Sequence, residues 1–219
     1  MKIVTLNIKK FQHDVDKKQV FHYIDLLNAD LYVIPEYCLR VINSKIQIYN
    51  PKNITDKRYS FTGVISGKYI IDYDCSEYNS VVLSTNHKTF PQILGVHIND
   101  STKIIEPIYD IILGDFNVGI DYNGNTNGMG YNSYITLIEN GYIDLWEYAL
   151  TCNKAYYVDY YGIKHQASSD IFYRTFISQK RDDFILSKIE YQIKLNKIII
   201  DYRTLAFTDH CAIIAEFEA

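Results

Sequence analysis

Short apolar runs that end in polar side chains recur along this chain, and they constrain its fold more than any other feature of the sequence. The run from Ile108 to Leu113 leads directly into Gly114-Asp115-Phe116-Asn117. A run of this length and composition is typical of a buried strand. Side chains two positions apart in an extended segment point the same way. We therefore expect Asp115 and Asn117 to leave the end of this strand together and to converge on one small volume, where an acceptor and an amide suit the handling of water and an anionic oxygen.

Similar polar groups stand beside other strand-like runs. They are Asn7 at the end of Lys2 to Ile8, Glu36 after Leu31 to Ile34, His97 after Ile93 to Val96, Asp183 within Arg181 to Leu186, and Asp209 with His210 before Cys211 to Phe217. Asn7 and Glu36 each place an oxygen that can bind a metal at a strand end, and we expect Asp183 on the same side of its strand as Arg181. The acids, amides and histidines thus gather at strand ends rather than scatter over the surface.

Each of these residues also has an ordinary structural explanation. Asp115 and Asn117 suit an Asx turn. Asn7 suits a strand cap, Glu36 a surface acid, His97 a core histidine, Asp183 an ion pair with Arg181, and Asp209 a turn. It is the joint pattern that favours a site. Outside this pattern, we interpret Asp121, Asp144 and His165 as loop or cap residues.

The order of these groups resembles that of the endonuclease/exonuclease/phosphatase superfamily, which includes deoxyribonuclease I, exonuclease III, neutral sphingomyelinases and inositol polyphosphate 5-phosphatases. The motifs are, in order, Leu6-Asn7, Pro35-Glu36, Val96-His97-Ile98, Gly114-Asp115-Phe116-Asn117, Arg181-Asp182-Asp183-Phe184-Ile185 and Thr208-Asp209-His210. The segment from Gly141 to Trp146 is also similar to one that these proteins carry. Thr208 stands where the family usually has Ser. The interval between His97 and Asp115 is short, and the family usually has a helix there. The insertions that contact the substrate in the family are therefore expected to be shortened in this chain.

The resemblance spans the chain from first strand to last and implies its fold. We expect an α+β protein, a four-layer α/β/β/α sandwich in which two mainly antiparallel sheets pack face to face under outer helices. Residues 1–219 would form a single catalytic domain, in agreement with the length and the 47% hydrophobic content. Periodicity alone would predict only a mixture of helices and strands.

The resemblance also implies a divalent-metal-dependent phosphodiester hydrolase, most of all a nuclease acting on DNA or RNA. Glu36 would be the principal Mg²⁺ ligand, with Asn7 and Asp209 contributing directly or through water, and Mn²⁺ would substitute. One alternative is a phosphoesterase acting on a small-molecule, lipid or inositol phosphate. Another is an inactive binding protein of the same fold, which the survival of the acidic and histidine positions disfavours.

The resemblance implies that the remaining site residues transfer protons or contact the phosphate. Asp115 and Asn117 would orient or deprotonate the attacking water. His210 would contact the scissile phosphate or act as a base, with Asp183 fixing its tautomer. His97 would donate to a nonbridging oxygen or protonate the leaving group. In the exonuclease III branch the position of His97 tends to be Tyr, so we expect an ordinary phosphodiester substrate without a strong preference for abasic DNA.

Charge and cysteine content limit the partners and the compartment. The formal charge of -4 argues against passive binding of nucleic acid by a basic field. Four lysines flank the end of the first strand and suit either phosphates or a solvated face: Lys9, Lys10, Lys17 and Lys18. The cysteines show no paired spacing and read as reduced thiols: Cys38, Cys75, Cys152 and Cys211. With no signal segment and no membrane span, we expect a cytoplasmic protein without membrane association or an obligate protein partner.

Several further elements are predicted from periodicity and turn residues. They are a helix from Lys17 to Asn28 capped by Asp14 or Asp16, adjacent strands at Ser80 to Ser84 and Ile93 to Ile98, a mobile loop beside the site from Asp121 to Tyr131, a helix capped by Ser133 that ends before Gly141, and a strand pair of Phe172 to Ile177 with Asp183 to Leu186.

Overall fold

The computed structural model of the chain describes residues 1–9, 14–38, 60–66, 70–74 and 79–218, which form two mixed sheets. The seven-stranded sheet has the order β10 (Lys164–Gln166), β9 (Ala155–Val158), β12 (Leu195–Asp201), β13 (Ala212–Phe217), β1 (Lys2–Thr5), β2 (Leu31–Cys38) and β3 (Ser60–Ser66). The six-stranded sheet has the order β4 (Ile70–Asp74), β5 (Ser80–Thr85), β6 (Gln92–His97), β7 (Ile111–Ile120), β11 (Arg181–Lys188) and β8 (Tyr142–Asp144).

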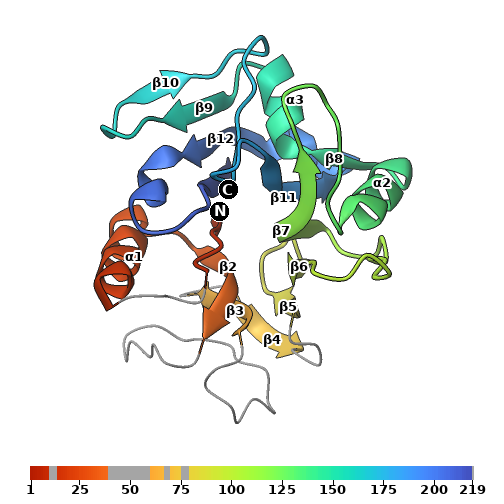
Figure 1. Cartoon of the computed structure of the whole chain (residues 1–219). Helices are drawn as coiled ribbons and strands as arrows, with labels where there is room; N and C mark the ends of the chain where they lie inside the picture. The colour runs from red at the N-terminus through yellow and green to blue at the C-terminus, as the bar shows by residue number, and fades with distance from the viewer. Residues whose placement is uncertain (10–13, 39–59, 67–69, 75–78, 219) are drawn as a thin grey trace.

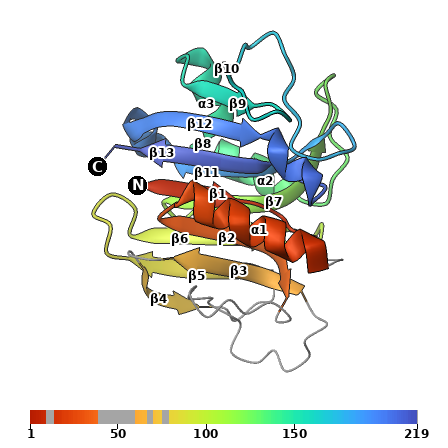
Figure 2. The same cartoon turned by 90° about the vertical axis from the view of Figure 1, so that its left-hand side faces the viewer.

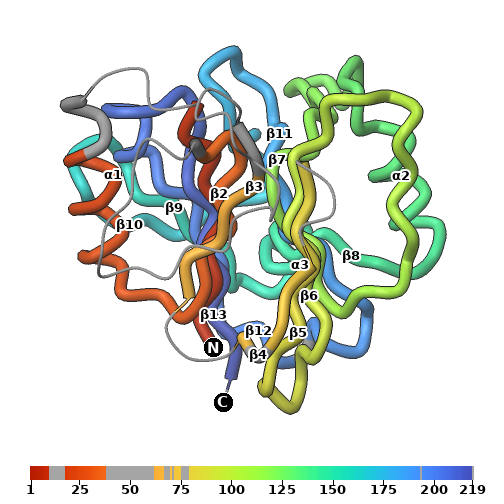
Figure 3. Tube along the Cα trace, turned by 90° about the horizontal axis from the view of Figure 1, so that it is seen from below, coloured from red at the N-terminus to blue at the C-terminus, as the bar shows by residue number. Residues whose placement is uncertain are grey.

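The two sheets pack face to face, with helices on their outer sides (Figure 3). Helix α1 (Asp14–Leu27) covers the seven-stranded sheet, and α2 (Tyr131–Glu139) lies outside the six-stranded one (Figures 1 and 2). A third helix, α3 (Leu145–Thr151), contacts β11 and β12 and so touches both sheets. Short 3₁₀ helices occupy Ile189–Lys194 and Tyr202–Ala206. Among the described residues, no helix is long and apolar enough to cross a membrane.

Strand pairing is mainly antiparallel, as predicted. Among the described strands, only β1 with β2, β9 with β12 and β6 with β7 run parallel. The predicted neighbours at Ser80 to Ser84 and Ile93 to Ile98 form the antiparallel pair β5 and β6. The predicted four-layer α/β/β/α architecture with two mainly antiparallel sheets is therefore confirmed.

Period-two alternation explains why each sheet has two buried faces. In β13, Ile213 belongs to the core between the sheets and Ile214 to the cluster under α1. In β7, Leu113 faces the inter-sheet core, whereas Ile112 joins the cluster that includes Leu137 of α2. Alternate side chains of a strand point to opposite faces. A strand that is apolar at successive positions therefore suits a central layer covered on both sides.

The helix boundaries differ slightly from the predicted ones. Helix α1 begins at Asp14, so Asp14 and Asp16 lie inside it rather than before it. Helix α2 begins at Tyr131 with Gly130 as its N-cap residue and ends before Gly141 as predicted. Ser133 is a buried residue of the helix, and its hydroxyl donates to the carbonyl oxygen of Lys103 at 2.5 Å. A serine near a helix start thus makes a tertiary contact in place of a cap.

Two predicted strands are corrected by the structure. The run from Ile108 to Leu113 is not one strand, because Ile108 is exposed and β7 extends from Ile111 to Ile120. The segment from Phe172 to Ile177 is not a strand either. Only Phe176 makes isolated bridges, to Lys180 and His210, because the chain reverses there with the N–H of Thr175 donating to the Lys180 carbonyl.

The segment from Asp121 to Gly130 connects β7 to α2 without regular secondary structure. It stays close to β7, since the N–H groups of Gly128 and Gly130 donate to the carbonyl oxygens of Val118 and Asn117. Cys211 is a buried free thiol and Cys152 an exposed one, as predicted. The side chains of Cys38, Cys75, Lys10 and Lys17 lie outside the described residues.

Gly114 allows β6 and β7 to approach closely. Its φ is +145°, and an added Cβ atom would lie 1.9 Å from the carbonyl oxygen of Val96. We predict that Gly114→Ala lowers the free energy of unfolding by about 3 kcal/mol, because backbone atoms cannot move aside. Gly124→Ala is the matched control, with φ of +78° and nothing within 4 Å, and should cost on the order of 1 kcal/mol. Equal losses in urea unfolding would contradict the steric explanation.

Candidate active site

Polar side chains from both sheets meet at one end of the inter-sheet core. Asn7 follows β1, Glu36 lies in β2, and His210 precedes β13 of the seven-stranded sheet. His97 ends β6, and Asp115 and Asp183 lie in β7 and β11 of the six-stranded sheet. Together with Asp209, seven of the eight predicted site residues have side chains within hydrogen-bond or ion-pair distance of another member's side chain. Asn117 lies beside this group and is described below.

Asn7 connects two carboxylates from different sheets. Its side chain is fully buried. The Nδ2 atom donates to Asp115 Oδ2 at 2.8 Å and to Glu36 Oε1 at 3.2 Å, while Oδ1 accepts the N–H of Lys9 at 2.8 Å. Asn7 therefore holds the two acids together. It would act as a metal ligand only with its amide group turned over, so that Oδ1 faces the carboxylates.

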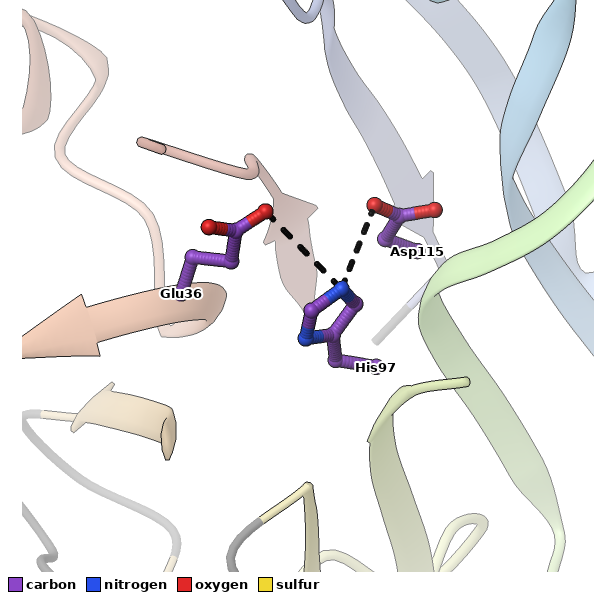
Figure 4. Close-up of side chains that lie close together, drawn as sticks. All are labelled: Glu36, His97 and Asp115. Carbon is purple, nitrogen blue, oxygen red and sulfur yellow. Dashed lines mark ion pairs between the residues drawn. The ribbon is translucent and has the colours of Figure 1, made fainter. Parts of the chain in front are cut away.

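His97 completes a second contact set with the same two acids (Figure 4). Its Nε2 atom lies 3.8 Å from Glu36 Oε1 and 3.9 Å from Asp115 Oδ2. Glu36, His97 and Asp115 can each turn one ligand atom toward the same small volume. His97 is only partly buried, so its ring is available to a substrate rather than sealed in the core.

His210 and Asp183 form a buried pair across the two sheets. His210 Nδ1 lies 2.9 Å from Asp183 Oδ2, and an ionised carboxylate can only accept, so Nδ1 donates. The Nε2 atom then faces the site, 3.9 Å from Asp115 Oδ2 and 3.9 Å from Asp209 Oδ1. The ring also contacts that of Phe176, with centroids 4.7 Å apart. The predicted hydrogen bond between Asp183 and His210 is therefore present.

The buried charges shift two pKa values strongly. Burial, then the charge of Asp183, raises the pKa of Asp115 to about 8, against the opposing effects of the His210 charge and the Asn7 hydrogen bond. Burial alone would lower the pKa of His210, but Asp183, Asp115 and Asp209 outweigh it and raise that pKa to about 10. Near neutral pH, His210 is thus a cation suited to an anionic oxygen, and Asp115 is poised to exchange a proton.

Among the described residues, one oxygen of Asp209 accepts a hydrogen bond and the other accepts none. Lys9 Nζ forms an ion pair with Oδ2, whereas Oδ1 is buried and has no hydrogen-bond partner there. The same holds for Oδ1 of Asp183. A buried carboxylate oxygen without a donor is costly, so these atoms suit a bound cation or a substrate donor. Thr208, in place of the Ser expected from the resemblance, donates to the Asn7 carbonyl at 2.8 Å.

Asn117 does not converge with the carboxylate of Asp115 as expected. Its φ is +51°, which breaks the period-two alternation. Its N–H donates to Asp115 Oδ1 at 2.9 Å in an Asx-type turn, and its Nδ2 donates to the carbonyl of Ile98 at 2.9 Å. Asn117 instead lines a cavity of about 430 Å³ together with His97. Asp115 and Asn117 therefore form the Asx turn that the sequence suggested as their ordinary explanation. Both residues nevertheless lie at the site.

Arg181 and Asp183 do not share a face of β11, which corrects our expectation. A bulge between them shifts the register against β7. Arg181 pairs with Asp144 and Glu147, and its guanidinium lies 4.6 Å from the ring centre of Phe184. Asp144 is also the N-cap of α3, in agreement with its interpretation as a cap. The bulge thus frees Asp183 from Arg181 and leaves it to His210.

Comparison with known proteins bears on the fold. No family model and no curated protein matches the chain. Among solved structures, the 3'-5' exonuclease NExo from Neisseria meningitidis covers 100% of both chains at 15% identity with a TM-score of 0.70. The endonuclease domain of TRAS1, a telomere-specific non-LTR retrotransposon, covers 99% of this chain and 97% of its own at 13% identity and a TM-score of 0.66. An endonuclease/exonuclease/phosphatase family protein from Leptotrichia buccalis covers 100% of both at 15% identity and 0.62.

The chain has the fold of the endonuclease/exonuclease/phosphatase superfamily. The resemblance stated from the sequence motifs is therefore confirmed at the level of the fold. In this chain the polar cluster comes from the ends of β1 and β6 and the segment before β13, where the sequence predicted it, whereas Glu36, Asp115 and Asp183 lie within β2, β7 and β11 rather than at strand ends. The roles of the individual residues stay predictions.

Three residues beside the cluster escaped the sequence analysis. Thr175 is fully buried, and its hydroxyl oxygen accepts the N–H groups of Asp182 and Asp183, both at 3.0 Å. Phe176 contacts His210, and Lys180 lines the cavity beside His97. The only available signal was their position just before the Arg181 motif, because residues in an irregular turn have no periodicity that could reveal their contacts.

The His210 and Asp183 pair generates a prediction about pH. In EDTA, Asp183→Asn should lower the His210 pKa measured by NMR from near 10, because burial then acts without its main opposing charge. The folded pKa exceeds the value of about 6.5 in an unfolded chain. The stabilisation is therefore fully present below that pH and is lost as the pH rises through about 10.

Wild-type unfolding free energy should consequently fall more steeply between these pH values than that of Asp183→Asn. Asp159→Asn is the matched control. Asp159 Oδ2 lies 2.9 Å from His165 Nε2, and this pair lies outside the site. An unchanged His210 titration in Asp183→Asn would disprove the electrostatic role of this pair.

Proposed function

We propose that this chain is a divalent-metal-dependent phosphodiesterase that hydrolyses nucleic acid. The observation that carries the proposal is the convergence of carboxylates and imidazoles from both sheets, with His97 Nε2 and His210 Nε2 each 3.9 Å from the same oxygen of Asp115. Proteins with the same fold support it. Two are named as an exonuclease and an endonuclease, and a 3' phosphatase from Neisseria is bound to a product DNA hairpin.

Glu36 and Asp209 would hold the metal ion, and Asn7 would be a further ligand once its amide turns its oxygen toward the carboxylates. The donor set fits Mg²⁺, a hard cation that takes few carboxylates and keeps several waters, and Mn²⁺ would substitute. The buried Oδ1 atom of Asp209, which accepts no hydrogen bond from the described residues, supports a cation here. When bound, such an ion neutralises negative charge on the phosphoryl oxygens.

The protein side chains would divide the work of the reaction by their charges. His210, held as a cation by Asp183, contacts a nonbridging phosphoryl oxygen through Nε2. The carboxylate form of Asp115 takes a proton from the attacking water; its pKa of about 8 makes this form the minor one near neutral pH but a stronger base than an ordinary carboxylate. Asn117 orients the water from the neighbouring cavity. His97, which approaches the same Asp115 oxygen as His210, protonates the leaving oxygen.

A second candidate substrate is a phosphate ester of a small molecule. The cavity of about 430 Å³ beside His97 supports it, because its lining is rich in polar side chains such as Asn99, Asn127 and Ser178, and a leaving group of modest size would fit there. Turnover with Mg²⁺ of plasmid DNA, RNA, abasic duplex and phosphate monoesters separates the candidates. Preference for intact nucleic acid supports the proposal, and preference for monoesters replaces it with the second candidate.

The metal assignment gives the first test. We expect hydrolysis to require Mg²⁺ or Mn²⁺, and Glu36→Gln to lose it because the carboxylate supplies the charge that holds the cation. Isothermal titration calorimetry with Mn²⁺ should detect weaker metal binding in the same variant. Glu147→Gln, which alters an acid outside the cluster that is paired with Arg181, is the control. Full turnover in excess EDTA would exclude the metal role.

The leaving-group role of His97 gives the second test. His97→Ala should reduce kcat on an oligonucleotide by about a hundredfold, as removal of a general acid does, with a smaller effect on KM. A substrate whose leaving group is nitrophenol needs no protonation and should be far less affected. His87→Ala controls for the loss of a histidine outside the site. If both substrates lose the same factor, His97 is not the acid.

A further inference from the structure

Lys9 places a positive charge beside the catalytic cluster. Its ammonium group pairs with Asp209, and its side chain remains 50% exposed. Its φ is +43°, a left-handed conformation that is unfavourable for a residue other than glycine. Lys9 also lines a cavity of about 260 Å³ with Thr208, Asp209 and the apolar side chain of Phe207. An exposed ion pair stabilises a fold little, so folding alone does not account for this arrangement.

Lys180 places a second positive charge in a different cavity. Its ammonium group donates to Asn127 Oδ1 at 3.0 Å. It lines the cavity of about 430 Å³ that also contains His97 and Asn117. Among the described residues, Lys180 donates to a neutral amide and forms no ion pair, so its charge can serve an anion that enters this cavity.

The turn from Phe176 to Lys180 separates the two cavities. Ile177 lines the cavity of Lys9, whereas Phe176 and Ser178 line the cavity of Lys180. The catalytic cluster also lies between the two cavities, because Asp209 lines the cavity of Lys9 and His97 lines the cavity of Lys180. A molecule that occupies both cavities therefore crosses the cluster and meets one lysine on each side of it.

We infer that Lys9 and Lys180 bind the two phosphates that flank the scissile phosphate of a polynucleotide strand. The inference rests on the proposed function and deepens it, because a phosphate monoester has no flanking phosphates to engage both lysines. A cation at Asp209 Oδ1 would share the carboxylate charge with Lys9, which contacts Oδ2, and would so weaken this ion pair and free the ammonium group for an anion. With a formal charge of -4, the chain has no general basic field, so local lysines must supply the attraction.

Salt dependence of binding tests the inference directly. The probe is a labelled single-stranded phosphorothioate DNA of about 12 nucleotides, measured by fluorescence anisotropy with Mg²⁺ between about 50 and 200 mM salt. Each protein–phosphate contact contributes about 0.7 to the slope of log K against log salt for a single strand. Lys9→Gln and Lys180→Gln should each reduce the slope by about this amount, and the double variant by about twice as much.

Lys164→Gln is the matched control, because it removes one charge from β10, where Lys164 lies over the ring of Tyr156. It should leave the slope unchanged. Turnover supplies a second readout. The two lysine variants should raise KM for a cleavable oligonucleotide several-fold more than KM for bis(p-nitrophenyl) phosphate, which has no flanking phosphates. Circular dichroism confirms that each variant is folded.

The outcomes separate this inference from the proposed function. If wild type cleaves the oligonucleotide and both variants keep the wild-type slope, the flanking-phosphate inference fails and the nuclease proposal stands. If a variant loses both substrates equally, its lysine belongs to the reaction centre, and the inference is overturned for that residue. If wild type hydrolyses only bis(p-nitrophenyl) phosphate or monoesters, the nucleic-acid proposal itself fails.

Discussion

Two buried polar contacts join the sheets at the site, and the remaining geometry depends on them. Asn7 donates to Asp115 at 2.8 Å, and His210 donates to Asp183 at 2.9 Å, each from the seven-stranded sheet to the six-stranded one. A buried charge without its partner is strongly destabilising. Sliding one sheet against the other would break these hydrogen bonds and leave buried polar groups without partners. The apolar core provides most of the stabilisation of the sandwich, but it is non-directional. These contacts fix how the sheets face each other, and they make the position of the site a property of the fold.

Backbone strain is concentrated at the same end of the molecule. Of the described residues other than glycine that adopt positive φ, three belong to this region: Lys9, Glu36 and Asn117. A register shift between Ile34 and Tyr37 in β2 accompanies the φ of +55° at Glu36. Such conformations cost about 1 to 3 kcal/mol each and persist where the surroundings overdetermine them. Here they turn side chains out of the period-two alternation of the strands, so that groups from neighbouring strands can point into one volume.

The sequence was sufficient for the parts of this molecule that depend on periodicity and motif order. Alternation and apolar runs located β5, β6, β7 and β11 of the six-stranded sheet but only β1, β2 and β13 of the seven-stranded one. The motif order predicted which residues meet, since Asn7 and Asp115 come together across 108 positions. It was insufficient where one residue changes the register. The bulge that separates Arg181 from Asp183 depends on pairing with β7. A period-two pattern in the sequence does not reveal where a residue is inserted in the strand. Ser133 likewise met a tertiary acceptor that local capping rules do not include.

Electrostatics explains how an acidic chain can offer a site to an anion. The cluster contains more carboxylates than cationic side chains. With all its carboxylates ionised and no cation bound, it would repel a phosphodiester. Three features reduce this repulsion locally: the retained proton of His210, the raised pKa of Asp115, and an oxygen of Asp209 that remains available to a cation. Because charges beyond about 8 to 10 Å are screened in physiological salt, the net charge of the chain matters less than these neighbours. Under the proposed function, attraction for the phosphodiester therefore depends on these two protons and on the bound cation rather than on the net charge of the chain.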